Sequence, residues 1–344
     1  MLWRSLADGG GGSADLYGFG PGLTVSIRGE RRARAYFRAE YGPASLTSGS
    51  EVPAVEAVIG ESARAPTTDE PELRGAHKLA RWHASVPVRP ELETMRIAVA
   101  VRGPLGLALV QSTVIEPLVS LAAVRADSVL LPGAAIAQGN RTVLLLGRSR
   151  SGKTSLAARA LAAGLRVLGD DQVIINADRE CLAFPRRLRL YPDLSRTAPA
   201  AFAALRPSVR TRLAALGRVK VLTRGFVAPP VSVSASAIGR NANDHVRLMI
   251  GEVVVVRRAC VDALTLQPLD PVQLRAEADD VLMGQRSEIF KVPGVRAAYE
   301  GLLAHERAII ACALAAAPAR RVLVPDSWSS EQAVGALAHE LRLA

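Results

Sequence analysis

The feature that most constrains the fold is the loop motif GRSRSGKT at 147–154, which fits the pattern G-x-x-x-x-G-K-[ST] at every position. The apolar run TVLLLG leads into it. A run of good helix formers, TSLAARALAA, starts at its last residue, Thr154. A strand, such a loop and a helix in this order direct backbone N–H groups and the positive helix end at one point. The alternative is a Gly- and Ser-rich linker, but a linker does not require a strand directly before it and a helix directly after it. The sequence therefore predicts a nucleotide phosphate site in an α/β fold.

Each position of the motif has an expected role. Gly147 and Gly152 allow the tight backbone turn, Lys153 reaches the β- and γ-phosphates, and Thr154 offers a hydroxyl to Mg²⁺. Two loop arginines either add charge to the site or are simply solvated, and we favour solvation because the backbone supplies most of the binding. The residues predicted to bind nucleotide are Gly147, Arg148, Ser149, Arg150, Ser151, Gly152, Lys153, Thr154 and Ser155.

Two adjacent aspartates, Asp170 and Asp171, follow only 17 positions after Lys153. A chain that returns directly after a short helix can bring both carboxylates beside a γ-phosphate. One carboxylate could hold Mg²⁺ and the other could accept the proton of an incoming hydroxyl. The alternative is that the pair merely caps a turn. Its position beside the phosphate loop and within an apolar strand pair favours the chemical role.

The block LLLGRSRSGKTSLAARALAAGLRVLGDDQVII resembles the HPr kinase/phosphorylase family and its wider set of HPr-kinase-like proteins. The match covers roughly residues 130–195. It implies a P-loop kinase core with a mixed sheet, related in fold to phosphoenolpyruvate carboxykinases, with ATP and Mg²⁺ as cofactors and a serine-type hydroxyl as acceptor. The resemblance carries catalytic roles to Lys153, Asp170 and Asp171. We assign the base to Asp170 and the metal contact to Thr154 and Asp171.

Two departures point to a divergent member of that family. Pro132 stands where the family usually has a histidine, and proline can act neither as acid or base nor as ligand. The nearest counterpart of a family Glu-x-Arg-Gly segment, Arg224-Gly225, lacks the glutamate. These losses argue against the HPr-directed enzyme itself.

The rest of the chain is expected to form three consecutive parts: an N-terminal α+β lobe, small and β-rich (1–117), the nucleotide-binding core (118–270) and a mostly helical C-terminal segment (271–344). Polar, Pro-rich residues 61–72 predict a loop, the stretch around Trp82 predicts a helix, and Gly139-Asn140 predicts a turn between strands. Ser329 or Ser330 is expected to start the last helix. Further strands are predicted at 23–29, 95–103, 107–115, 187–194, 219–236 and 252–259, and helices at 116–126 and 295–317.

Composition narrows the class of protein. With 49% hydrophobic residues the chain should be globular, and it has no uninterrupted apolar run of 18 residues, so we expect no membrane partner. Cys181, Cys260 and Cys312 lack metal spacing and predict reduced, mostly buried thiols in a cytoplasmic protein. The net charge of +11 comes from arginines spread along the chain, so a nucleic-acid partner is disfavoured. A homo-oligomer stays open.

Three functions remain after this reading. The first is an ATP-dependent kinase acting on a hydroxyl of a peptide, protein or small metabolite. The second is a nucleotide-binding regulatory or accessory protein with little phosphotransfer, and the third, motivated by charge alone, is a phosphotransferase acting on nucleic acid. Arg186, Arg187 and Arg189 could clamp an acidic substrate, but their alternation also fits a half-exposed strand with basic side chains outward, which we favour.

Overall fold

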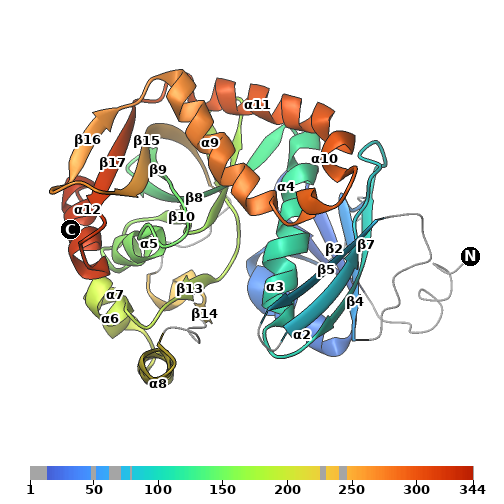
Figure 1. Cartoon of the computed structure of the whole chain (residues 1–344), viewed down its shortest axis with the longest axis horizontal. Coiled ribbons are helices and arrows are strands. Elements are labelled where there is room, and N and C mark those ends of the chain that lie inside the picture. Colours follow the sequence, from blue (N-terminus) through green and yellow to red (C-terminus); the bar gives the residue numbers. More distant parts are fainter. Residues whose placement is uncertain are drawn as a thin grey trace, which may run out of the picture. The chain divides into compact units, whose positions relative to one another are not determined.

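The computed structural model describes residues 14–47, 52–61, 71–77, 80–224, 230–239 and 246–343. They form a mixed α/β protein with two mixed sheets, of seven and eight strands (Figure 1). Unit 1 comprises the residues up to Leu130 together with Leu282–Ile309, and unit 2 comprises Leu131–Val281 and the residues from Ile310 onward. Each compact unit therefore draws on two segments, whereas the sequence suggested consecutive parts. Segment 282–309 joins unit 1 through buried polar contacts that local sequence patterns do not reveal.

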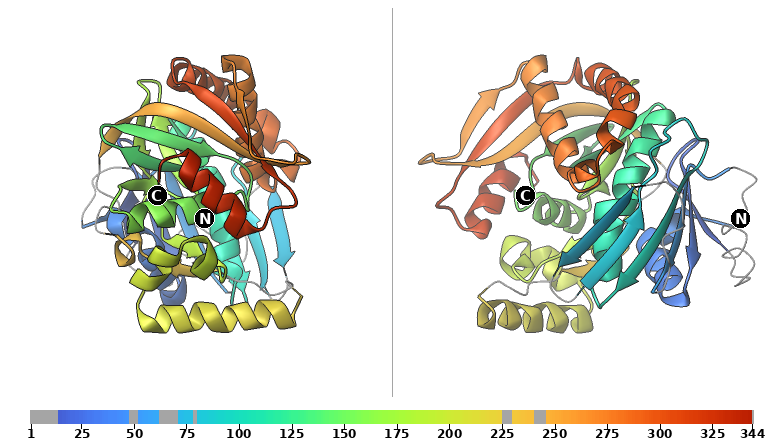
Figure 2. Two further views of the ribbon diagram at one scale, coloured as in Figure 1. Left: turned by 90° about the vertical axis from the view of Figure 1, so that its left-hand side faces the viewer. Right: turned by 45° about the vertical axis from the view of Figure 1, so that its right-hand side comes forward.

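Unit 1 is built on the seven-stranded sheet, whose order is β3-β1-β2-β4-β7-β6-β5 (Figure 2, right). Strands β2, β4 and β7 run parallel, and the outer strands pair antiparallel. The strands predicted at 23–29 and 95–103 are confirmed as β2 and β7. The bounds are β1 (Asp15–Gly18), β2 (Thr24–Gly29), β3 (Ser45–Leu46), β4 (Val55–Gly60), β5 (Glu72–His77), β6 (Ala80–Ser85) and β7 (Met95–Arg102).

The helix predicted around Trp82 is wrong, because this stretch forms the antiparallel pair β5–β6. Gly75 lies opposite Trp82, and a Cβ at Gly75 would come within 2.2 Å of the indole ring. The glycine thus makes room for a large cross-strand neighbour, a pairing that local propensity does not reveal. Of the predicted loop 61–72, residues 62–70 lie outside the described part of the chain.

The longest apolar stretch of unit 1 is helical from Gly106 to Arg125, as α3 (Gly106–Val110), a π-helical segment η2 (Gln111–Ile115) and α4 (Glu116–Arg125). The predicted helix at 116–126 is confirmed and the predicted strand at 107–115 is wrong. A run buried on nearly all sides shows no period that separates strand from helix. By length and composition this helix could cross a membrane, but 72% of its most apolar part is buried inside the structure. That burial is typical of a core helix.

Among its described residues, unit 1 also contains one longer helix and three short helical elements, and two further helices run from one unit into the other. The predicted helix at 295–317 is confirmed, with a break at Tyr299 between α10 and α11. The bounds are α2 (Arg31–Tyr41), η1 (Gly42–Ala44), α9 (Pro271–Arg286), η4 (Ile289–Lys291), α10 (Val295–Ala298) and α11 (Glu300–Leu314).

Unit 2 is organised around strand β9 (Arg141–Leu146), which pairs antiparallel with β8 (Ser128–Gln138) and parallel with β15 (Arg247–Ala259). Leu144, Leu145 and Leu146 are completely buried, as expected of a central strand. The predicted turn at Gly139-Asn140 and the predicted strand at 252–259 are confirmed. The other strands of this sheet are β10 (Val167–Gly169), β11 (Gln172–Asn176), β12 (Glu180–Ala183), β16 (Thr265–Pro268) and β17 (Ala319–Pro325).

Helix α5 (Lys153–Ala162) leaves the loop after β9 and packs its apolar side into a core shared with the last helix, α12 (Ser330–Glu340) (Figure 1). Gly164 has a positive φ of 81°, the conformation favoured just past a helix end. Ser329 caps α12 in a reciprocal pair of hydrogen bonds with Gln332, which confirms the predicted start. The remaining elements of this unit are β13 (Leu188–Leu190), β14 (Val231–Val233), α6 (Leu194–Thr197), α7 (Pro199–Ala204), α8 (Pro207–Leu222) and η3 (Ala235–Ala237).

Two expectations for unit 2 need correction, one about residues 219–222 and one about the cysteines. Residues 219–222 are the end of α8 and not a strand, because Pro207 starts a helix whose late valines imitate a strand pattern. The C-terminal segment, predicted to be mostly helical, contains a strand, β17, which pairs parallel with β15. Cys181 is buried, but Cys260 and Cys312 are exposed, so the thiols are free yet not mostly buried.

Candidate functional site

The predicted phosphate loop lies between β9 and α5, at the end of the central strand of unit 2. Gly147 and Gly152 have φ values of 151° and 96°, which the glycines adopt without a steric penalty, and Arg150 also has a positive φ of 69°. A Cβ at Gly147 would approach the carbonyl oxygen of Val256, on β15, to 2.6 Å. Both glycines are therefore required by the geometry of the loop.

Lys153 folds back into the curve of this loop. Its Nζ donates to the carbonyl oxygens of Gly147 at 2.6 Å and Arg148 at 3.0 Å, and to Oγ of Ser151 at 3.2 Å. Burial lowers the pKa of Lys153, while the negative charges of Asp171 and Asp170 oppose this shift. A buried ammonium group inside a glycine-bounded loop is positioned to meet an anion.

Asp170 and Asp171 occupy the sharp break between β10 and β11, as the sequence predicted. The backbone is fixed there because the N–H of Gly133, on β8, donates to the carbonyl oxygen of Asp171 at 2.9 Å. Pro132 is thus the immediate neighbour of a residue bonded to the aspartate pair. Position 132, where the family that the sequence resembles has a histidine, lies next to this pair and carries no ionisable group.

The two carboxyl groups have opposite environments. Asp170 is buried, and its Oδ2 atom has no hydrogen-bond partner. Burial, followed by the negative charge of Asp171, raises the pKa of Asp170 to about 6, although Arg186 and a hydrogen bond with Thr154 oppose the rise. The side chain of Asp171 is 51% exposed. Burial of its surroundings acts to raise its pKa, but Arg186, Arg189 and Lys153 outweigh this and lower it.

Arg186 is a site residue whose role the sequence reading missed. Its side chain is only 4% exposed, and Nη1 donates to Oδ2 of Asp171 at 3.0 Å. The outward orientation favoured for this side chain is therefore wrong. The signal was present in the spacing, because Arg186 has the same parity as Leu188 and Leu190, which are buried on β13. Arg187 and Arg189 have the other parity.

A cavity of about 520 Å³ opens beside the phosphate loop, within unit 2. Ligand pockets of this size hold molecules as large as a nucleoside phosphate. Arg258 fixes one wall, since its Nη1 donates to the carbonyl oxygens of Pro325 at 2.8 Å and Trp328 at 2.7 Å. The lining residues are Gly147, Arg148, Ser149, Arg150, Ser151, Val256, Arg257, Arg258, Glu277, Asp280, Val281, Asp326, Trp328 and Ser330.

The loop arginines differ in their contacts. Arg148 makes a bidentate ion pair with Asp280 on α9, in which Nη2 donates to Oδ1 at 3.0 Å and Nε to Oδ2 at 3.2 Å, although its side chain remains 76% exposed. The same carboxylate lies 3.5 Å from Arg257. Arg150 is exposed, as expected of a solvated loop residue. An anion in the cavity would therefore meet arginine side chains that already have carboxylate partners.

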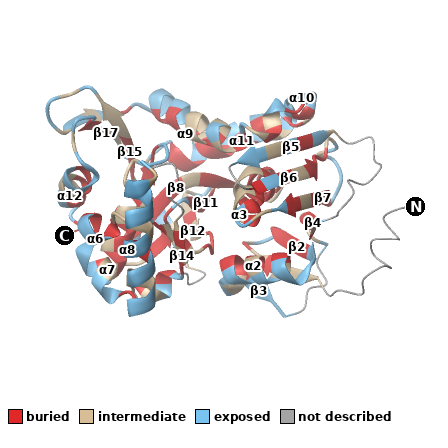
Figure 3. Cartoon of the chain, turned by 60° about the horizontal axis from the view of Figure 1, so that its bottom comes forward, coloured by how far each residue is buried: buried red, intermediate tan, exposed pale blue. Residues whose placement is uncertain are grey.

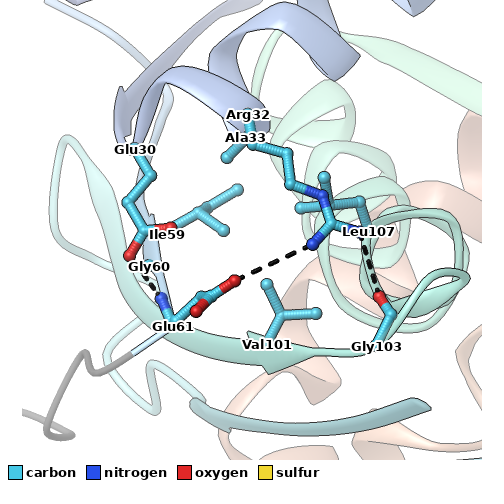
Figure 4. A pocket seen from close by; sticks show the side chains of 9 residues that line it. All are labelled: Glu30, Arg32, Ala33, Ile59, Gly60, Glu61, Val101, Gly103 and Leu107. Carbon is cyan, nitrogen blue, oxygen red and sulfur yellow. Dashed lines mark hydrogen bonds and ion pairs between the residues drawn. The ribbon is translucent and has the colours of Figure 1, made fainter. Parts of the chain in front are cut away.

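Unit 1 contains a much smaller cavity, of about 10 Å³ (Figure 4). Arg32 spans it, donating to the carbonyl oxygen of Gly103 at 3.3 Å and lying 3.8 Å from a carboxylate oxygen of Glu61. Such a space holds about one water molecule and no organic ligand. The cavity in unit 1 is therefore too small for a ligand site, and the candidate site lies at the larger cavity in unit 2.

The raised pKa of Asp170 predicts a pH-dependent stability in the absence of divalent cations. Between about pH 4 and 6 the folded protein holds a proton on Asp170 that the unfolded chain releases, so stability should fall as pH rises through this window. Asp170→Asn cannot ionise. The difference in free energy of unfolding between the variant and wild type should therefore shift in favour of the variant by about 1 kcal/mol from pH 5 to pH 7. Urea unfolding with a chelator at both pH values measures this, and an equal difference at both would contradict it.

Comparison of the chain with protein-family models gave no match, and a search of curated proteins gave no significant match. The chemistry of this site therefore has to be inferred from the side chains that form it.

Proposed function

We propose that this protein is a Mg²⁺-dependent kinase with a P-loop core of the HPr kinase type, which transfers the γ-phosphate of ATP to a serine-type hydroxyl. The observation that carries the proposal is the pairing of a buried lysine inside the glycine loop with a buried carboxylate oxygen, on Asp170, that has no hydrogen-bond partner. A phosphate and a cation would satisfy these two groups together.

The residues present fit Mg²⁺. A buried carboxylate oxygen without a partner is costly unless a proton or a cation reaches it, and Thr154, a hydroxyl donor, hydrogen-bonds to the same side chain. Within the described residues no three His, Cys, Asp or Glu side chains form a metal cluster. Mg²⁺ does not need one, because it is commonly held by one or two carboxylates, water and the substrate phosphates. When bound, it would neutralise charge developing on the phosphates.

The geometry favours a different division of labour between the aspartates from the one inferred by resemblance. Asp170 is the carboxylate in contact with Thr154, so we propose that these two residues would hold Mg²⁺. Asp171 is half-exposed and fixed by Arg186, which leaves it accessible to an acceptor. We therefore propose Asp171 as the group that receives the hydroxyl proton.

The transfer itself then needs little from the protein beyond positioning. The acceptor oxygen forms a bond to the γ-phosphorus while the bond from that phosphorus to the β–γ bridging oxygen breaks, and ADP leaves. Asp171 takes the acceptor proton, and Lys153 exchanges its carbonyl contacts for phosphate oxygens. Arg186 holds Asp171 in place and keeps it ionised.

The cavity beside the loop is the proposed place for the nucleoside. Trp328 is the aromatic residue among those that line the cavity, and the two hydrogen bonds from Arg258 to the carbonyl oxygens of Pro325 and Trp328 keep that segment fixed. Stacking of a base on an aromatic ring is favourable and tolerates different bases. The arrangement therefore supports nucleotide binding without selecting ATP over GTP.

A second candidate function is supported by Pro132. Its place next to the aspartate pair gives the site no ionisable side chain at the position of the family histidine. A nucleotide-binding regulatory protein, which binds ATP and transfers phosphate slowly or not at all, would tolerate that loss.

The test combines γ-labelled ATP, Mg²⁺ and a pool of free serine, free threonine and serine peptides. Wild type should label one acceptor class, and Lys153→Met should reduce the rate by about 100-fold or more, because it removes a charged donor to the transferred phosphate. Lys291→Met is the matched control, since Lys291 is exposed and pairs only with Glu288 among the described residues. ATP bound by wild type, with no transfer to any acceptor, would favour the regulatory function.

A further inference from the structure

Arginines and lysines are spread along the whole chain, and the longest stretch without an acidic residue lies between Asp193 and Asp244. Residues 194–243 contain eight arginines and lysines and no aspartate or glutamate. This stretch has a charge of +8, against a net charge of +11 for the whole chain. Helix α8 lies in its middle and carries several of these basic residues.

Helix α8 contacts the rest of unit 2 along a narrow seam. Leu213 is its one fully buried residue, and Val209 and Leu216 are half-buried on the same side. The opposite side is exposed over its whole length, and Figure 3 shows the helix mostly pale blue. At helical spacing this outward face carries Ser208, Thr211, Arg212, Ala215, Arg218, Val219 and Leu222.

The basic residues of this face have no acidic partner among the described residues. Neither Arg212 nor Arg218 forms an ion pair there, whereas Arg257 and Arg286 are paired with glutamates. Because no acid lies within the stretch itself, these charges cannot be neutralised by neighbours in sequence. They remain available to a partner of opposite charge.

Exposed apolar side chains lie beside these charges. Leu222 is 83% exposed and Val219 is 36% exposed, on the same outward face as Arg218. Covering either side chain with apolar surface would be favourable, because it removes apolar area from water. We call Arg212, Arg218, Val219 and Leu222 together the α8 patch.

We propose that the α8 patch docks an acidic segment of a protein acceptor, with carboxylates pairing to Arg212 and Arg218 and an apolar side chain covering Val219 and Leu222. The identification of the partner as the phosphoryl acceptor rests on the proposed kinase function. Helix α8 belongs to the same compact unit as the phosphate loop. Binding outside the reacting groups is a common way to select a protein substrate by charge pattern.

The composition of the patch favours a peptide over other anions. Helix α8 has no aromatic residue, and single-stranded nucleic acids are usually bound by stacking on aromatic rings. An amphipathic helix that lies on a membrane has a broad apolar face, whereas the exposed apolar side chains here are confined to the last turn. Mixed basic and apolar side chains suit an acidic segment that also contains leucine or a similar residue.

The test uses the full chain and a labelled synthetic peptide of repeating Glu-Glu-Leu-Ser, with fluorescence anisotropy as the readout. Wild type should bind this peptide, with affinity that falls as salt rises, and should bind a Gln-Gln-Leu-Ser version at least about tenfold more weakly. The double variant Arg212→Glu/Arg218→Glu should lose about tenfold or more in affinity, and Leu222→Ser a smaller factor. Arg81→Glu/Arg296→Glu changes the net charge equally at exposed positions of unit 1 and should stay within about twofold of wild type.

Equal losses in both double variants, or no preference for Glu over Gln, would overturn the proposal. So would tighter binding of phosphatidylserine vesicles or of a thymidine oligonucleotide that depends on the same arginines. Transfer from γ-labelled ATP to the peptide serine and to free serine is measured separately. Peptide binding lost in the α8 variant without any transfer would support the docking surface and reject the kinase. Transfer to the peptide unaffected by the α8 variant would reject the docking surface alone.

Discussion

Asp170→Asn is expected to reduce phosphoryl transfer by about 100-fold or more while leaving nucleotide binding largely intact. The substitution removes the buried carboxylate oxygen that has no protein partner, and with it the charge beside Thr154 that would attract Mg²⁺. The Mg²⁺ concentration needed for half-maximal transfer should also rise. Transfer rates over a range of Mg²⁺ concentrations, together with nucleotide binding, measure both effects.

Asp171→Asn separates the roles of the two carboxylates. If Asp171 receives the proton of the acceptor, its loss should slow transfer by about 100-fold or more and leave the Mg²⁺ requirement unchanged. Asp178→Asn is the matched control, since Asp178 is exposed in the turn after β11. A rise in the Mg²⁺ requirement for Asp171→Asn, and none for Asp170→Asn, would restore the assignment made from resemblance.

The parts of the site that could be predicted from sequence are the local ones. The glycine loop, Lys153 and the aspartate pair follow one another within 25 residues, so strand, loop and helix patterns place them together. The loop also needs backbone conformations that a particular residue type favours, such as the positive φ of Gly152. Local sequence patterns were therefore sufficient to predict where these residues lie.

What could not be predicted depends on contacts between distant segments. The cavity wall at Trp328 and the ion pair from Arg148 to Asp280 join residues more than 100 positions apart. The return of 282–309 to unit 1 and the insertion of β17 beside β15 are of the same kind. Arg186 is an intermediate case, because its parity with buried leucines was visible but its partner, Asp171, was not.

The second large effect is expected in unit 1, at the buried ion pair between Arg286 and Glu306. The arginine side chain is completely buried and donates from both Nη atoms to the Glu306 carboxylate, and one of them also donates to Oγ of Ser120. Glu306→Gln should lower the free energy of unfolding by about 3–5 kcal/mol, because it leaves the buried guanidinium without its counter-charge. Urea unfolding followed by circular dichroism measures this loss. A loss below about 1 kcal/mol would mean that water reaches the arginine.

The double variant Arg286→Met/Glu306→Leu should recover most of that stability, although it removes both members of the pair. Taking two charges out of water is expensive, and their mutual attraction repays the expense only in part, so apolar side chains of similar volume often do as well. Ser120 loses one donor in this variant, a smaller effect of about 1 kcal/mol. Recovery would show that the pair fixes how segment 282–309 joins α4 more than it stabilises the unit. If the double variant were as unstable as Glu306→Gln, the ion pair itself would be a net source of stability.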